Sequence, residues 1–256
     1  MAIYVFTDTQ MKALADAIRA KAGSTGDLTI EQMTAAVTGL STGGGTASVW
    51  KECWLEKPKA LPNTTFVNTG IAAAFEDELE VTCRSSIGLM SACFNAAGSS
   101  GTRMGINFLP NSNKAQAYWG SYANTSITID RTELDVTNTM TIKQNKTGVI
   151  INGINAAGTT VTWTNEYTAT GTAAPSEPYK LFTYARNESI HYGVFRKAIV
   201  RKDQNSVVYT IVPEVSNIFT ARLKITRKVV DTGNETISYV DVPAGFICYV
   251  DTVGAT

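Results

Sequence analysis

Three glutamates at alternate positions, Glu76, Glu78 and Glu80, are the residues whose spacing comes closest to a catalytic arrangement. Side chains two residues apart on a strand share one face, and a retaining glycosidase needs two carboxyl groups about 5 Å apart. The run contains few apolar residues that could desolvate one carboxyl group and make it a general acid. A solvent-exposed strand face has the same spacing. We therefore interpret the glutamates as such a face and predict that the protein is not an enzyme.

The sequence offers few other groups for catalysis or metal binding. His191 is the only histidine, so any Ser-His-Asp site would need it, and neither a G-x-S-x-G nor an H-E-x-x-H motif occurs. Cys53, Cys83, Cys93 and Cys248 have no C-x-x-C spacing, which indicates reduced thiols in the core rather than a zinc site. We predict neither a metal site nor a cofactor.

A segment rich in aromatic and amide side chains is the best candidate for ligand binding. Tyr118, Trp119, Tyr122 and Asn124 lie close together in the sequence and are the predicted ligand-binding residues. Sugars stack their C–H faces on aromatic rings and hydrogen-bond to amides through their hydroxyl groups. Alternate aromatic residues of a strand can equally point into the core, and the sequence leaves both interpretations open.

Charge and hydropathy argue against two classes of partner. Lysine plus arginine and aspartate plus glutamate each number 22, and charged residues make up 17% of the chain. The charged fraction is below the globular average of roughly 25%, and zero net charge argues against nucleic-acid binding through bulk positive charge. No segment reaches the roughly 20 apolar residues of a membrane helix, and Met1–Phe6 lacks the features of a signal peptide. We expect cytoplasmic synthesis and no membrane insertion.

Two short amphipathic helices, forming a hairpin, are predicted within residues 1–41. Thr7 with Gln10, and Thr29 with Gln32, have the spacing of capping boxes at helix starts. Apolar residues follow each box at helical spacing, so they align on one face. The residues predicted to mediate attachment or oligomerisation are Met11, Leu14, Ile18, Met33, Val37 and Leu40.

A helical hairpin of this size needs a partner surface. Helices of about three to four turns are marginal in water on their own. The partner could be the same hairpin in neighbouring subunits, another protein or the chain's own β domain, and we favour docking onto another chain. Residues 42–48 contain three consecutive glycines and are predicted to form a flexible linker to the next domain.

From residue 49 to residue 256 the apolar period shortens to two, which is typical of β-strands. Leu79, Val81 and Cys83 alternate with polar residues and are expected to face one way. Turn sequences separate many short apolar runs, which favours an antiparallel two-sheet jelly roll over βαβ units. Residues 218–256 still alternate and are predicted to add strands. The runs are 127–129, 140–142, 149–151, 161–163, 181–184, 194–200 and 207–212, and the predicted turns are Asn152-Gly153, Ala157-Gly158, Asn187-Glu188 and Asp203-Gln204-Asn205.

Two parts of the chain resemble phage virion proteins. Phe6-Thr-Asp-Thr-Gln10 and Ala15-Asp-Ala-Ile-Arg-Ala-Lys21 resemble the opening helical hairpin of tail, baseplate and fibre components. The later region resembles the concanavalin A-like, laminin-G-type lectin and glucanase sandwich common in such proteins. Residues 218–256 depart from that pattern, which commonly closes with Gly-Leu-Tyr-Asp and an aromatic strand. The second resemblance is carried by Asn68-Thr-Gly-Ile71, Gly148-Val-Ile-Ile-Asn-Gly153, Tyr179-Lys-Leu-Phe182, Gly193-Val-Phe195 and Val207-Val-Tyr-Thr-Ile-Val-Pro213.

The resemblance implies a virion protein exposed on the particle and synthesised in the bacterial host cytoplasm. Its expected role is that of a tail-fibre or receptor-binding protein that adheres to a bacterial surface glycan without catalysis. A purely structural baseplate or capsid-surface protein and a glycan depolymerase are the alternatives. The expected partners are other virion proteins, the glycan, and further copies of the chain, for which a trimer is a common arrangement.

Overall fold

The computed structural model places two units along the 256-residue chain, with the division between Val49 and Trp50. The helical hairpin predicted for residues 1–41 and the linker predicted for residues 42–48 lie outside the described residues. Asp16 is the exception and is helical. The described residues are 16, 49–62, 64–85, 93–97, 102–108, 114–121, 125–128, 134–169, 174–183, 192–216 and 220–250.

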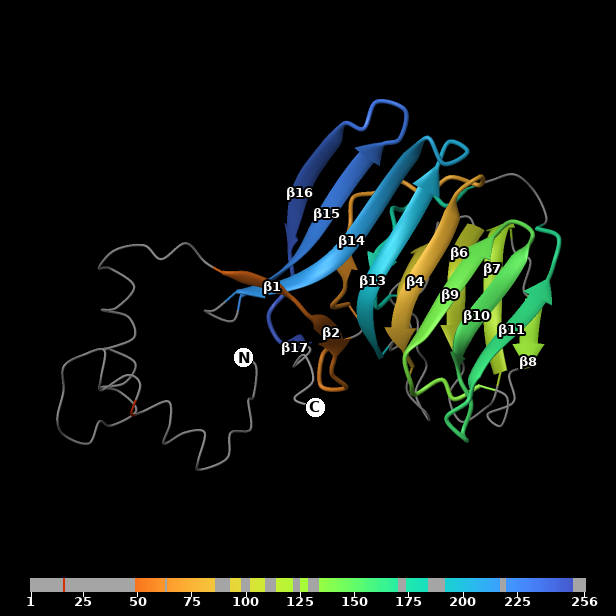
Figure 1. The fold of residues 1–256 in the computed structure, drawn as a ribbon, viewed down its shortest axis with the longest axis horizontal. Helices are drawn as coiled ribbons and strands as arrows, with labels where there is room; N and C mark the ends of the chain where they lie inside the picture. The colour runs from red at the N-terminus through yellow and green to blue at the C-terminus, as the bar shows by residue number, and fades with distance from the viewer. Residues whose placement is uncertain are drawn as a thin grey trace. The chain divides into compact units, whose positions relative to one another are not determined.

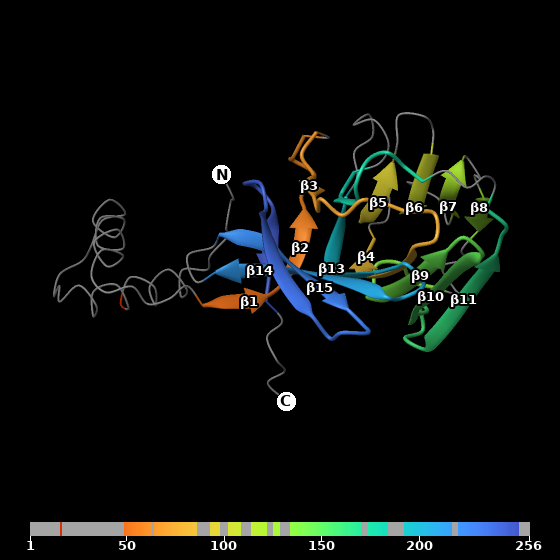
Figure 2. The ribbon, with the colours of Figure 1, turned by 90° about the horizontal axis from the view of Figure 1, so that it is seen from above.

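The second unit is mainly β and consists of two antiparallel sheets, as the alternating sequence predicts. Figure 2 shows β5–β8 in one layer and β4, β9, β10 and β11 in the other. The small sheet has the order β3 (Val67–Asn68), β12 (Lys180–Leu181), β5 (Phe94–Ala97), β6 (Thr102–Phe108), β7 (Lys114–Ser121) and β8 (Thr125–Thr128). The large sheet has the order β11 (Thr160–Glu166), β10 (Gly148–Ile154), β9 (Met140–Asn145), β4 (Glu78–Arg84), β13 (Gly193–Lys202), β14 (Val207–Ser216), β15 (Ala221–Val229) and β16 (Glu235–Asp241).

Three short strands join the large sheet beside this series (Figure 1). They are β1 (Trp50–Glu52), which pairs with β14, β2 (Trp54–Lys57), which pairs with β13, and β17 (Ile247–Tyr249), which pairs with β2. Strands β13 and β14 pair directly only near their turn, through residues 198–202 and 207–211. Farther from the turn, β2 pairs with 193–195 and β1 with 214–216, so the segment that opens the unit completes the sheet.

The core lies between the two sheets and follows the alternation of the strands. Leu79, Val81 and Cys83 are buried, whereas the intervening side chains of β4 point to the outer face, which confirms the predicted pattern. Phe94 of the small sheet stacks on Phe195 of the large sheet, with ring centroids 6.1 Å apart. Burial of these apolar faces stabilises the unit.

Three charged side chains, Asp77, Lys57 and Glu214, are buried in the described part of the unit, and Glu214 forms an ion pair with Arg222. Asp77 is 1% exposed, and its carboxylate accepts hydrogen bonds from Lys202 Nζ at 2.8 Å, Tyr179 Oη at 2.9 Å and the Ala74 amide at 2.8 Å. Lys57 is also 1% exposed and lies 3.5 Å from the Phe182 carbonyl oxygen. Burial lowers the pKa of Lys57 to about 8.

Two predicted turns are confirmed and one is wrong. Asp203-Gln204-Asn205 forms the β13–β14 turn with all three residues at positive φ, and Gly158 adopts a φ of 78° in the β10–β11 turn. Asn152-Gly153 instead lies inside β10. A Cβ atom at Gly153 would stand 2.7 Å from Leu134 Cδ1, so this glycine permits close packing rather than chain reversal. Asn187-Glu188 lies outside the described residues.

Candidate functional site

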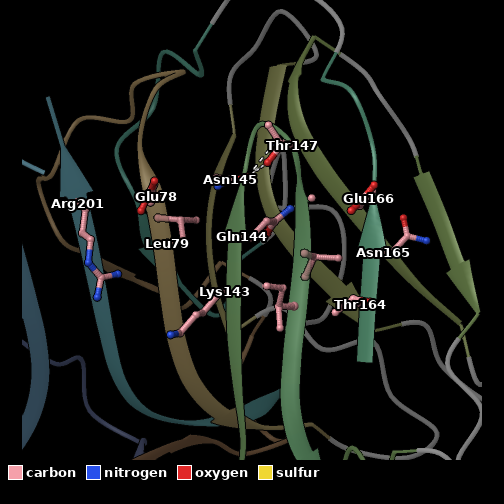
Figure 3. A pocket seen from close by; sticks show the side chains of 13 residues that line it. Glu78, Leu79, Lys143, Gln144, Asn145, Thr147, Thr164, Asn165, Glu166 and Arg201 are labelled. Atoms are coloured by element: carbon pink, nitrogen blue, oxygen red, sulfur yellow. Dashed lines mark hydrogen bonds between the residues drawn. The ribbon is translucent and has the colours of Figure 1, made fainter. Parts of the chain in front are cut away.

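A groove of about 370 Å³ lies along the large sheet, over β4, β9, β10, β11 and β13. Figure 3 shows Arg201 and Glu78 on one side of it, Lys143 and Asn145 in the middle, and Glu166 on the other side. The alternation of the strands turns these polar side chains away from the core. The remaining lining residues are Leu79, Gln144, Thr147, Gly148, Val149, Ile150, Thr164 and Asn165.

Ion pairs position the cations at one side of the groove. Glu80 Oε2 lies 2.9 Å from Arg201 Nη2 and 3.9 Å from Lys143 Nζ. The register places Glu80 opposite Lys143 on β9, and Arg201 opposite Glu78 on β4. Glu80 therefore holds the side chains of β9 and β13 beside β4. Glu78, two residues earlier on β4, lines the groove itself.

The turn between β9 and β10 shapes the end of the groove. Asn145 Oδ1 accepts hydrogen bonds from the Thr147 amide at 2.9 Å and from Thr147 Oγ1 at 2.7 Å. Tyr167 Oη donates to the Asn145 carbonyl at 2.9 Å, and burial raises the pKa of this phenol. These contacts fix the turn, and with it the Asn145 and Thr147 side chains.

A buried amide holds the floor of the groove against the small sheet. Gln144 Nε2 lies 3.2 Å from the Gly105 carbonyl, 3.1 Å from the Tyr118 carbonyl and 2.9 Å from Tyr167 Oη. Gln144 points inward from β9, and the two carbonyls belong to β6 and β7. The contact ties the strand that carries Lys143 and Asn145 to the opposite sheet.

The two glutamates of the groove, Glu78 and Glu166, lie on strands at opposite sides of it. The register pairs Glu166 with Gly148 and Gly148 with Asn145, and the next residue of β9, Gln144, pairs with Leu79, the neighbour of Glu78. Three strand spacings separate the two glutamates, which is about 14 Å between their backbones. Both retaining and inverting mechanisms need two carboxyl groups within about 10 Å of each other. The groove can offer hydrogen-bond donors and acceptors, and the backbones of its two glutamates stand farther apart than the carboxyl groups of such a pair.

The structure separates the residues that the sequence predicts for binding. Trp119 is fully buried, faces the core from β7, and donates its indole N–H to the Phe75 carbonyl at 2.8 Å. Tyr118 points to the opposite side of β7, where its hydroxyl donates to Gln116 and Arg103 lies 5.5 Å from its ring centroid. Tyr118 is only 4% exposed. Of the two interpretations that the sequence leaves open, stacking on a sugar and packing in the core, Trp119 follows the second.

Tyr118 and Trp119 do not line the groove. The side chains of Tyr122 and Asn124 lie outside the described residues, and so does His191. Glu76 lies in the turn before β4 and forms an ion pair with Lys146. Among the candidates that the structure describes, Glu78 alone lines the groove; Lys143, Asn145, Glu166 and Arg201 were not among the predicted site residues. Of these residues, Asn145 belongs to a segment whose sequence, Asn145-Lys-Thr-Gly148, has the composition of a turn.

The four cysteines are free thiols that meet in two pairs. A thiol hydrogen bond joins Cys53 to Cys248, and another joins Cys83 to Cys93. The hydrogen bonds and burial raise the pKa of Cys53 and of Cys83. Cys53, Cys83 and Cys93 are buried, as predicted for core thiols, whereas Cys248 is half-buried.

Comparison with models of protein families and with curated proteins gives no match for this chain. Within the described ranges, no group of three or more His, Cys, Asp or Glu side chains is arranged to hold a metal ion. No helix among those residues has the length and apolarity to span a membrane.

Proposed function

We propose that the β unit is a glycan-binding adhesion module, and that the chain is a phage tail-fibre or receptor-binding protein that uses it on a bacterial surface. The proposal assigns the two packed antiparallel sheets to the concanavalin A-like jelly-roll type. Its support is the sequence resemblance described above together with the groove on the large sheet. Binding is proposed without catalysis, and the predicted hairpin at residues 1–41 is proposed to attach the module to other virion proteins or to further copies.

The composition of the groove is the observation that carries the glycan assignment. Saccharide hydroxyl groups both donate and accept hydrogen bonds, so a site for them needs both kinds of partner. Glu78 and Glu166 supply acceptors, Lys143 and Arg201 supply donors, and Asn145 supplies both. Such an open groove of about 370 Å³ suits part of an extended chain of sugars better than a small apolar ligand.

The two alternatives make different demands on the same residues. A depolymerase needs a pair of carboxyl groups at catalytic separation, and the spacing of Glu78 and Glu166 along the sheet does not provide one. Glu80 is ion-paired with Arg201 and Lys143, an arrangement that serves to position strands. A purely structural virion protein needs no groove with this set of polar side chains.

The matched variants Glu78→Gln and Glu235→Gln test the proposal. Both remove one carboxylate charge from the large sheet, but Glu235 is exposed on β16 outside the groove. In glycan-array and cell-wall binding measurements with the full chain, Glu78→Gln is expected to weaken binding about tenfold, because hydrogen bonds to charged groups contribute roughly 1.5–3 kcal/mol. Glu235→Gln is expected to bind like the unchanged chain.

Three results would contradict the proposal. Absence of saturable binding to any bacterial glycan favours the structural alternative. Equal loss of binding in both variants places the site elsewhere. Release of reducing sugar by the unchanged chain, abolished by Glu78→Gln, favours the depolymerase. Binding should be measured for single sites, because repeated copies raise the apparent affinity through avidity.

A further inference from the structure

Strand β16 is the last strand of the large sheet and projects with β15 beyond the sandwich (Figure 1). Among the described residues, β15 is the only strand that pairs with it. Six of its seven residues are exposed, including Ile237 at 48% and Tyr239 at 50%. An open edge of this length that carries apolar side chains is a template for pairing with another strand.

The hydrogen bonds at the two ends of the β15–β16 ladder show which backbone groups face the open edge. The Val229 amide donates to the Asn234 carbonyl at 2.9 Å, and the Val242 amide donates to the Ala221 carbonyl at 3.1 Å. Hydrogen-bonded pairs recur at every second residue of an antiparallel ladder, so Thr236, Ser238 and Val240 bond to β15. The N–H and C=O groups that point outward therefore belong to Glu235, Ile237, Tyr239 and Asp241.

We propose that β16 pairs antiparallel with β16 of a second copy of this chain, around a two-fold axis at Ser238. Ser238 is the middle residue of Glu235–Asp241, so the two strands overlap along their whole length in this register. Ile237 then stands opposite Tyr239 of the second copy, and both residues carry outward N–H and C=O groups. Each such pair exchanges two backbone hydrogen bonds, and the two-fold axis repeats the pair on the other side.

The side chains on the outer face complement one another in the same register. Ile237 and Tyr239 of the two copies form two aromatic–β-branched pairs, which are among the stabilising cross-strand combinations. Tyr239 is already held in place, because its ring lies 3.6 Å from the guanidinium carbon of Arg222. Pairing covers the two most exposed apolar side chains of β16.

The charges at the ends of the strand are balanced within each copy. Glu235 meets Asp241 of the second copy, which brings two carboxylates side by side. On β15, Lys228 lies opposite Glu235 and Arg222 lies opposite Asp241. Each carboxylate at the join therefore lies beside a cation of its own copy, although Arg222 also pairs with Glu214 on β14, with its Nη2 3.0 Å from Glu214 Oε2. The two-fold register brings the two most exposed apolar side chains of each β16 against those of the other copy, which favours a second copy as the occupant.

The first test compares two substitutions at one position in the full chain. Ile237→Pro removes an amide that faces the open edge and leaves the ladder to β15 intact, whereas Ile237→Thr keeps the amide and the β-branched side chain. Sedimentation at equal concentration measures the mass of the assembly in solution. The Ile237→Pro assembly is expected to have half the mass of the wild-type assembly, and the Ile237→Thr assembly the same mass as wild type. Circular dichroism checks that the proline variant is folded. An unchanged mass in folded Ile237→Pro, including a wild-type chain that is already monomeric, overturns the proposal.

The second test reads the register directly. At the two-fold axis residue 238 faces residue 238 of the other copy in a non-hydrogen-bonded pair, so Ser238→Cys is expected to form an intermolecular disulfide under mild oxidation by glutathione disulfide. Thr236→Cys lies on the same face, but there it meets Val240 of the other copy and is expected to remain unlinked. Equal crosslinking of both variants, or none of Ser238→Cys, contradicts the proposed pairing. Pairing of β16 with a different protein would also leave Ser238→Cys unlinked.

Discussion

At the scale of single residues, buried polar side chains connect parts of the β unit that lie far apart in the sequence. Gln144 joins β9 to the small sheet, and the Asp77 carboxylate accepts hydrogen bonds from Lys202, Tyr179 and a backbone amide. Both residues are buried and hydrogen-bonded, which is the condition under which polar groups are tolerated in a core. Neither could be distinguished from a surface residue in the sequence, because their partners lie far away along the chain.

Lys57 gives a prediction about pH. Its pKa is lowered from 10.5 to about 8 by burial, so between these values the unfolded chain holds more protons than the folded one. Its unfavourable contribution is therefore complete below pH 8 and disappears as the pH rises towards 10.5. Lys57→Met is expected to raise the free energy of unfolding by about 1 to 3 kcal/mol at pH 7, with a gain that shrinks towards pH 10.5.

Denaturant titrations at several pH values check this expectation. Lys59→Met is the matched control, because Lys59 is exposed two residues further on. The control should change stability by less than about 0.5 kcal/mol at every pH. A constant difference between Lys57→Met and the unchanged chain from pH 7 to pH 10.5 would show that the burial of Lys57 has no electrostatic cost.

At the scale of elements, the sequence predicts strands well where one face is buried and poorly where both are. Alternation is plain in β4, β9 and β10, whose outer faces meet solvent. It is absent from β6, where six of seven residues are buried, and no apolar run was predicted there. The same limit applies to the groove. Glu78 is visible as part of an alternating run, but Lys143, Glu166 and Arg201 join it only through the register of five strands.

Two glycines with opposite roles give a prediction at this scale. Gly153→Ala places a Cβ atom 2.7 Å from Leu134 Cδ1 in a fully buried position, and overpacking of this kind costs about 1–3 kcal/mol. Gly158 lies in a turn with positive φ and no atom within 4 Å of an added Cβ. Gly158→Asn is expected to cost less than about 1 kcal/mol, because asparagine tolerates this conformation. Thermal unfolding of both variants checks the difference, and an equal loss would mean that Gly153 acts through its backbone.

At the scale of the whole β unit, the opening segment reaches the interior of the large sheet through β2, whereas β1 and β17 each have a single strand neighbour among the described residues. β2 has β13 on one side and β17 on the other, and Cys53 and Leu55 are fully buried. Arg222 lies 3.7 Å from the Trp50 ring and 3.6 Å from the Tyr239 ring, so it links β1 to the β15–β16 extension. The unit should therefore unfold cooperatively, its opening segment included.

Hydrogen exchange measures this cooperativity. In dilute solution the amides of residues 53–57 are expected to exchange only by global unfolding, as slowly as those of β13. At concentrations where the chain is monomeric, the outward amides of Ile237 and Tyr239 are expected to exchange much faster, because β16 then has a single strand neighbour among the described residues. Fast exchange throughout residues 53–57 would show that the opening segment frays independently of the sheet.

The insertion of β1 and β2 beside β14 and β13 also determines how the β unit responds to mechanical load. The chain enters this unit at Trp50, so tension arriving there acts along the length of two strands that are hydrogen-bonded within the sheet. β1 has one strand neighbour, β14, and β2 has two, β13 and β17, so load that enters at Trp50 passes through β1 before it reaches the interior strand. Any anchor upstream of residue 50 therefore pulls first on the short strand β1 and only then on the buried strand β2.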